Sequence, residues 1–302
     1  MGWERANFFA RPEIGIEPKY EYSWGRQNWH EANAIEHKAV REQAGLFDLT
    51  SFAKFSVKGK DAAAVMSYMS AGPVAGDVGG SVYTQWLNDK GGIEADLTVS
   101  RISEREFWVI GGAGTRARDL FAIEQAILNH PGGEANATVT DITSAYAVLA
   151  VMGPASRDIV QSLTQADMSE ESFPFATNQQ IDIGSCLVRA NRMSYVGELG
   201  WELYVPTEFA VHVFDQLIEA GEPHGMELAG YHTLNSLRFE KGYRHWGHEV
   251  TPDDNPVHSG LNFAVDWDKD FRGKEALAEA KAFGSTRRLI QVAVHDLSLI
   301  HI

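Results

Sequence analysis

The sequence has little cysteine, little positive charge and no long apolar run, and each shortage excludes a class of protein. The single cysteine among 302 residues, Cys186, has no partner within the chain for a disulfide and cannot build a cysteine-rich zinc site. The chain carries 41 acidic side chains against 26 lysines and arginines, and this formal charge of −15 repels a phosphate backbone. We therefore predict no nucleic-acid partner.

The apolar stretches are too short for a membrane protein. The longest, residues 145–152, falls far below the roughly 20 residues that a helix needs to cross a bilayer. Residues 1–20 lack the apolar core of a signal peptide, and no transit peptide is seen. With 44% hydrophobic and 22% charged residues, we expect a soluble globular protein with no membrane partner, located in the cytoplasm or, if eukaryotic, in the mitochondrial matrix.

Strand-like and helix-like patterns alternate along the chain, which favours a mixed α+β fold. Residues 1–30 are aromatic and aperiodic, and are predicted to form an extended arm that packs on something larger. Gly45 is placed to end a first helix over residues 31–45, and Asp61 is a plausible cap for a second helix through Met69. Further helices are predicted over residues 115–129, 156–163, 208–221 and 233–241, and strands within 46–57 and over 82–87, 93–99, 107–110, 145–152, 187–194 and 201–205.

The end of the chain predicts an incomplete domain. Residues 271–274 open a helix, and a strand is expected over residues 287–294. The sequence then stops within eight residues, which leaves that strand without a downstream partner. We interpret this as a truncated chain.

Two motifs suggest other chemistry but are weak. Gly112–Ala117 follows the dinucleotide pattern G-x-G-x-x-A between a strand and a helix, although the preceding hairpin looks antiparallel and no strand ending in an acid follows at the usual distance. His245 and His248 lie near several acids and are candidate metal ligands. However, Trp246-Gly247 between them indicates a turn, not one face of a helix. We predict no metal site and keep the nicotinamide oxidoreductase only as an alternative.

Two acids occupy positions where a strand is expected. On a strand, Asp96 shares one face with Glu94 and Thr98, while the other face is apolar. Glu202 follows the glycine-rich turn 195–200 into the next strand. If these polar faces meet solvent, the acids are ordinary edge charges; if they line a pocket, they could move a proton or stabilise a cation.

At these two segments the sequence resembles a known family. GGIEADLTV (91–99) and SYVGELGWELYVP (194–206) resemble the folate-binding module of aminomethyltransferases, the T-protein of the glycine cleavage system, in the patterns Gly-Gly-x-x-x-Asp and Tyr-x-Gly-Glu-x-Gly-x-Glu. The flanking stretches, such as GWERANFF and LRFEKGYRHWGHEVTPDDNPVHSGLNFAV, look closer still to the C-terminal half of sarcosine and dimethylglycine dehydrogenases. The resemblance covers residues 1–292.

The resemblance implies an aminomethyltransferase-like fold with mixed and antiparallel sheets, flanking helices and a truncated C-terminal β-barrel. Its expected parts are a connector arm from a missing flavin domain (1–30), the folate-binding domain (31–270) and the start of the barrel (271–302). FAD would belong to that missing N-terminal half, so a flavin domain or subunit is the implied partner.

The implied activity is one-carbon transfer. In such enzymes the flavin half oxidises an N-methyl amine to an iminium, and the folate half captures the carbon on tetrahydrofolate as 5,10-methylenetetrahydrofolate. The alternative is a non-catalytic folate-binding relative linked to iron–sulfur maintenance, which carries a Lys-Gly-Cys signature. This chain reads Lys241-Gly242-Tyr243 and keeps Asp96, and both features favour the enzyme.

The family motifs also imply site residues. Asp96 matches the catalytic aspartate and Glu202 the glutamate that holds the pterin; a carboxylate can accept two neighbouring N–H groups or the proton of an attacking amine. The other expected pocket residues are Tyr195, Tyr83, Phe52, Thr98 and Ile110.

Two positions depart from the T-protein pattern. Gly112 stands where the T-protein has an asparagine that contacts the pterin, and Leu234 stands near the position of the arginine that meets the glutamyl tail. Arg238, Lys241 and Arg244 lie nearby and either supply that positive charge or belong to a solvated helix face.

Overall fold

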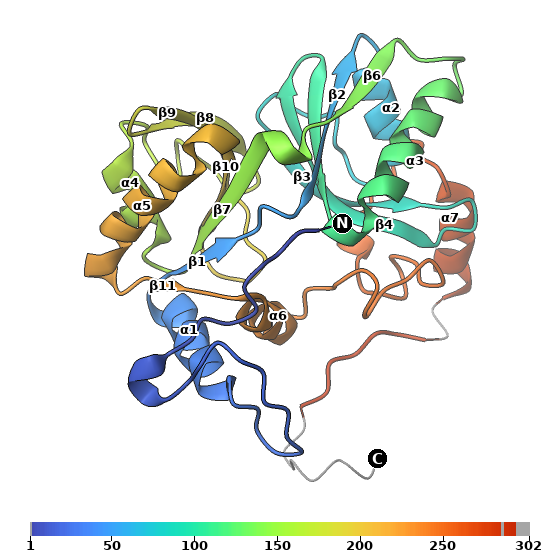
Figure 1. Ribbon diagram of the computed structural model, residues 1–302. Coiled ribbons are helices and arrows are strands. Elements are labelled where there is room, and N and C mark those ends of the chain that lie inside the picture. Colours follow the sequence, from blue (N-terminus) through green and yellow to red (C-terminus); the bar gives the residue numbers. More distant parts are fainter. Residues whose placement is uncertain (1, 285–286, 294–302) are drawn as a thin grey trace.

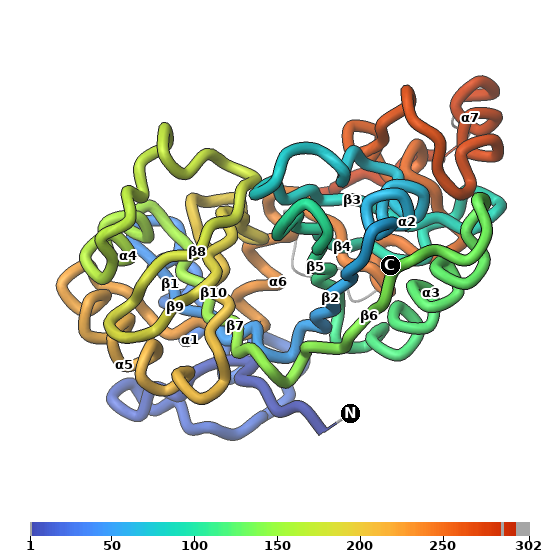
Figure 2. Tube along the Cα trace, turned by 90° about the horizontal axis from the view of Figure 1, so that it is seen from above, coloured from blue at the N-terminus to red at the C-terminus, as the bar shows by residue number. Residues whose placement is uncertain are grey.

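The computed structural model describes residues 2–284 and 287–293, whose strands form two sheets lying side by side (Figures 1 and 2). The larger sheet has the order β11-β1-β7-β10-β9-β8 and the smaller the order β3-β4-β5-β2-β6. The strands of the larger sheet are β1 (Gly45–Asp48), β7 (Tyr146–Met152), β8 (Asn178–Ile183), β9 (Cys186–Asn191), β10 (Gly200–Pro206) and β11 (Glu227–Leu228). Those of the smaller are β2 (Ala53–Gly59), β3 (Ser81–Leu87), β4 (Ile93–Ser103), β5 (Glu106–Gly111) and β6 (Ala137–Asp141).

Two helices cover the outer face of the larger sheet. They are α4 (Ser156–Leu163) and α5 (Ala210–Gly221), which bury Ile159 and Leu217 in the same core as Trp201 and Leu203 of β10. Because side chains alternate along a strand, Glu202 and Tyr204 point to the opposite, inner face.

The smaller sheet is built in the same way. Helices α2 (Ala62–Met69) and α3 (Arg116–Leu128) pack on one face, where Val65 and Ile123 meet Leu97 and Val109. Asp96 and Thr98, which neighbour Leu97 on β4, therefore lie on the inner face. The predicted alternation along this strand is confirmed.

A shared core joins the two inner faces. It contains Trp108 and Ile110 from the smaller sheet, Tyr204 from the larger sheet, and Leu234 and Leu237 from α6 (Tyr231–Glu240). The rings of Trp108 and Tyr204 meet edge to face with centroids 6.0 Å apart. Helix α6 lies near the middle of the molecule in both views (Figures 1 and 2), so the region between the sheets is assembled from distant parts of the chain.

The N-terminal arm runs along α1 (His30–Glu42) and the start of α6 and contains the short 3-10 helix η1 (Pro12–Ile14). Its Ala6 carbonyl accepts the Tyr231 N–H at 3.1 Å, and the Trp29 ring stacks on His232 at 5.4 Å. Buried Glu36 accepts the Phe9 N–H at 2.8 Å and the Gly230 N–H at 2.9 Å. The arm is thus held against the body of the chain; its role as a connector stays a prediction.

The structure corrects several local predictions. Helix α1 ends at Glu42, and Gly45 begins β1, where an added Cβ would lie 2.4 Å from the Val40 side chain. Asp61 does precede α2, but its carboxylate accepts the Asn136 N–H at 2.8 Å instead of capping the helix. The edge strands β6 and β8 were not predicted.

The α+β class and the antiparallel and mixed sheets are confirmed. At the C-terminus, helix α7 (Lys274–Phe283) forms as expected. The prediction of a strand over residues 287–294 is wrong for residues 287–293, which form no strand. Val294 lies outside the described residues. Among the described residues, no helix combines the length and apolar character needed to span a membrane.

Candidate active site between the two sheets

Asp96 lies on β4 directly opposite Gln85 of β3. The Gln85 Nε2 group donates to Asp96 Oδ1 at 2.9 Å, and the Asp96 side chain is half-buried. Burial raises the pKa of Asp96 to about 6, against the opposing effects of hydrogen bonds from Gln85 and Tyr83 and of the Arg244 charge. This carboxylate is therefore mostly ionised at pH 7 and still takes up a proton readily.

One row of neighbouring side chains near Asp96 crosses the three strands β3, β4 and β5. Tyr83 of β3 pairs with Thr98 of β4, and Thr98 pairs with Ile110 of β5. Burial and the neighbouring Asp96 carboxylate raise the pKa of Tyr83 well above its usual value, so its hydroxyl stays protonated. The structure thus places Tyr83, Asp96, Thr98 and Ile110 together on one inner face.

Glu202 lies on the inner face of the larger sheet and is 8% exposed. The Tyr204 hydroxyl donates to Glu202 Oε2 at 2.6 Å. Burial raises the pKa of Glu202 to about 6, while Tyr204 and Asn191 act in the opposite direction. Asn191 of β9 lies opposite Glu202 in register.

Tyr195 lies at the edge of this region, just before the turn that leads into β10. Its hydroxyl donates to the Arg244 carbonyl, and its ring stacks on Tyr243 with centroids 6.0 Å apart. Burial raises the pKa of Tyr195 well above its usual value, and the Asp96 charge adds to that effect. Tyr195 and Asp96 therefore share an electrostatic environment.

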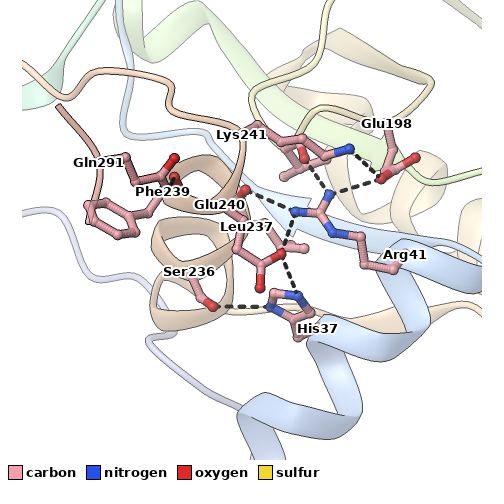
Figure 3. A network of polar contacts seen from close by, with 10 residues as sticks. His37, Arg41, Glu198, Ser236, Leu237, Phe239, Glu240, Lys241 and Gln291 are labelled. Carbon is pink, nitrogen blue, oxygen red and sulfur yellow. Dashed lines mark hydrogen bonds and ion pairs between the residues drawn. The ribbon is translucent and has the colours of Figure 1, made fainter. Parts of the chain in front are cut away.

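A charged network anchors the turn that carries Tyr195 (Figure 3). Arg41 of α1 donates to the Val196 carbonyl at 2.6 Å and to the Glu198 carboxylate at 3.0 Å. Its other terminal nitrogen donates to the Leu237 carbonyl and to Glu240, both at 3.0 Å. One guanidinium thus ties the turn before β10 to the end of α6.

The network also explains a glycine in the motif. Gly197 has a φ of 75°, and an added Cβ there would lie 2.3 Å from Cγ of Lys241. Lys241 in turn pairs with Glu198 at 3.4 Å. Both the backbone conformation and the close packing therefore require glycine at this position.

The remaining predicted residues pack on the shared core. Ile110 is 5% exposed within it, and half-buried Phe52 and Tyr195 lie against it. Asp96 and Glu202 belong to the inner faces of different sheets, joined through the Trp108–Tyr204 contact. The shared core thus contains Ile110, which pairs with Thr98, and Tyr204, which neighbours Glu202 on β10, while a single site joining the two acids stays a prediction.

Two cavities border this region without entering it. One of about 500 Å³ is lined by residues 73–74, 76–82 and 176–179. The other, of about 280 Å³, is lined by residues 175, 192–194 and 198–200 and touches the turn before β10. Neither Asp96 nor Glu202 lines either cavity, so the expected pocket joining the two acids is not one of these.

Three important neighbours were not predicted from the sequence. Gln85 and Tyr204 each lie on the same strand face as a predicted residue, two positions from Tyr83 and from Glu202, so the strand period would have found them. Arg41 gives no such signal, because its contacts are more than 150 residues away along the chain.

The three cations near α6 differ in their surroundings. Arg238 is 3% exposed and pairs with Glu249 at 2.7 Å, so it does not belong to a solvated face. Arg244 donates to the Ser259 carbonyl at 2.9 Å. The Lys241 side chain is 42% exposed, and Leu234 is buried in the shared core.

The two weaker motifs lack the context that their chemistry needs. Gly112 follows β5, whose neighbours β4 and β2 both run antiparallel to it, whereas a dinucleotide motif needs a parallel strand–helix–strand unit. The His245 and His248 rings lie 4.2 Å apart. No group of three potential metal ligands occurs in the part of the chain that the structure describes.

Comparisons with known proteins agree with the fold and the motifs. The family model described as the GCVT N-terminal domain matches residues 1–269. A 4-methylaminobutanoate oxidase (formaldehyde-forming) of Paenarthrobacter nicotinovorans is 40% identical over 98% of this chain and 35% of its own length. The mitochondrial dimethylglycine dehydrogenase of Mus musculus is 37% identical over 97% of this chain and 33% of its own length.

A solved structure has the same architecture. The glycine cleavage system aminomethyltransferase T of Bartonella henselae superposes with a TM-score of 0.76 at 25% identity, covering 89% of this chain and 73% of that one. The chain spans about a third of the two curated relatives but most of this enzyme.

Proposed function

The chain belongs to the GCVT N-terminal domain family, and from that premise we propose that it accepts a methylene unit from an oxidised N-methyl amine onto tetrahydrofolate. The family makes it a folate-dependent aminomethyltransferase-type module. The donor, an iminium of the sarcosine or dimethylglycine type, and the product, 5,10-methylenetetrahydrofolate, are the proposal. Its main support is Asp96, a carboxylate with a pKa of about 6 on the motif strand.

The polar groups present suit a flat heterocycle rich in donors and acceptors. Gln85 Oε1 and both amide atoms of Asn191 are buried without a hydrogen-bond partner among the described residues. Leaving such groups unpaired costs about 1–3 kcal/mol each, and a polar ligand between the sheets would remove that cost. Glu202 would accept the N–H groups of the pterin, and Phe52 and Tyr83 would contact its ring.

Proton movement at Asp96 is the catalytic contribution that we propose. Tetrahydrofolate supplies the two amine nitrogens that take up the carbon, and the two protons that they lose leave with the released amine. Asp96 accepts a proton from the attacking amine and returns it to the departing amine. The negative charge of its carboxylate also offsets the positive charge of the iminium. Gln85 holds the carboxylate in place for this exchange.

We propose that a flavin domain or subunit carrying FAD supplies the iminium. The support is that the amine oxidase and dehydrogenase relatives are about three times as long as the part that this chain matches. The mitochondrial relative also supports a place in the matrix if the chain is eukaryotic, with the cytoplasm as the alternative.

The proposal can be tested on the chain itself. Anaerobic calorimetry measures tetrahydrofolate binding, and ¹³C NMR follows a labelled methylene unit from an iminium prepared from ¹³C-formaldehyde and sarcosine. We expect saturable binding and transfer faster than in buffer. Binding without acceleration would favour the non-catalytic folate-binding alternative, and no binding would refute both.

A further inference from the structure

Asn191 is a buried asparagine whose side-chain amide makes no hydrogen bond of good geometry within the described part of the chain. It is 1% exposed, and neither Nδ2 nor Oδ1 has a hydrogen-bond partner among the described residues. We infer that Asn191 is a further ligand-binding residue, which works with Glu202 to bind the polar edge of the pterin ring. This inference rests on the proposed function and adds a specificity-determining residue to it.

The position of Asn191 directs its amide toward the interior between the sheets. It lies opposite Glu202 in the β9–β10 ladder, so both side chains project from the same face. Tyr204, two residues after Glu202, shares this face and belongs to the core between the sheets. The amide lies beside Glu202 and Tyr204 and lowers the pKa of both groups, but neither of its polar atoms makes a hydrogen bond of good geometry with them.

The next strand offers an internal comparison. Asn178 of β8 lies opposite Asn191 on the other side and is also buried, at 3% exposure. Its Nδ2 donates to the Gly80 carbonyl and to Ser81 Oγ, both at 3.2 Å, and its Oδ1 accepts from Arg189 at 2.7 Å. The fold therefore gives one asparagine of this pair three hydrogen bonds, and among the described residues it gives the one beside Glu202 none of good geometry.

The chemistry of the pair indicates what it binds. An ionised carboxylate only accepts hydrogen bonds, whereas an amide both donates and accepts. Glu202 and Asn191 together match a ring edge on which N–H groups alternate with a carbonyl or ring nitrogen, as in an aminopyrimidinone. A site built in this way discriminates against analogues that lack one of these groups.

The test separates binding from stability. Asn191→Leu keeps the size of the side chain and removes the amide, so we expect tetrahydrofolate to bind about tenfold more weakly or worse. The melting temperature without ligand should equal or exceed that of the unmodified chain, because an unpaired polar group has been removed. Calorimetry and thermal unfolding measure the two effects.

A matched control uses another buried polar atom that has no hydrogen-bond partner among the residues described. Ser156 Oγ lies at the start of α4, on the outer side of the same sheet, so Ser156→Ala should leave folate affinity unchanged. Asn191→Ala replaces the leucine variant if leucine prevents folding, with the same expected loss of affinity. Affinity within twofold of the unmodified chain refutes the role of Asn191 alone, whereas an unmodified chain that does not bind folate refutes the proposed function as well.

Discussion

The two sheets carry similar groups on their inner faces but connect them differently. Asp96 and Glu202 each lie opposite an amide side chain, Gln85 and Asn191, and burial raises the pKa of both acids to about 6. Each acid also has a tyrosine beside it, but Gln85 makes the 2.9 Å bond to Asp96, whereas Tyr204 makes the 2.6 Å bond to Glu202. We propose that the two acids, despite the same pKa, have different uses.

The neighbours of the two acids also differ. Asp96 is half-buried and feels the charge of Arg244, and in this setting we expect it to exchange a proton with a substrate. Glu202 is 8% exposed and held by Tyr204 at 2.6 Å, which fixes the direction of its free lone pairs. We therefore propose that the smaller sheet carries out transfer and the larger sheet recognition.

Removing the exchangeable proton site should have the largest effect. We expect Asp96→Asn to slow methylene transfer by about 100-fold or more, the usual scale for losing a proton-transfer group, with tetrahydrofolate affinity nearly unchanged. Stopped-flow transfer assays and calorimetry give the two numbers. Unchanged turnover would remove Asp96 from the mechanism.

The matching change on the larger sheet should affect binding instead. We expect Glu202→Ala to weaken tetrahydrofolate binding by roughly tenfold or more, because the ring loses a charged acceptor. Transfer at saturating folate should change much less than in Asp96→Asn. Equal affinity in calorimetry would place the pterin elsewhere.

The transfer rate and the folate affinity should each depend on pH, through Asp96 and through Glu202 respectively. If Asp96 acts as a base with a pKa of about 6, transfer at saturating folate rises about tenfold from pH 5 to pH 7 and then levels off. Folate affinity should also rise with pH through about 6, because ionised Glu202 is the better acceptor. In Asp96→Asn the rise in transfer rate should disappear while that in affinity persists; loss of both would assign both effects to one group.

The sequence was sufficient to predict the strands that bury one apolar face. The alternation of Leu97 and Val99 with Asp96 and Thr98 predicts β4 and its polar face, and the structure agrees. It failed for the edge strands β6 and β8: ATVTD of β6 buries no residue fully, and NQQIDI of β8 buries Ile181 and Ile183 but begins with three polar residues. Edge strands of this kind give a weak pattern because only part of one face is covered.

Side-chain partners were harder to predict than strands. The resemblance gave Asp96 and Glu202, and the strand period could have added Gln85 and Tyr204. The role of Asn191 depends on its register with β10 and on which polar atoms remain unpaired, and neither is visible in one sequence. Tertiary packing decides both.

The smallest expected effect concerns Arg41, whose hydrogen bonds within the described residues link α1 to α6 and to the turn before β10. Its four contacts hold the turn before β10 against α6, and none of them reaches the smaller sheet (Figure 3). Arg41→Gln should therefore lower folate affinity on the order of threefold and leave transfer at saturating folate unchanged, because the turn loosens while Asp96 stays in place. Lys58→Gln, which removes an exposed partner of Glu106 far from the turn, serves as the control. A fall in the saturated transfer rate of Arg41→Gln, without a fall in affinity, would show that the two sheets do not divide the work in this way.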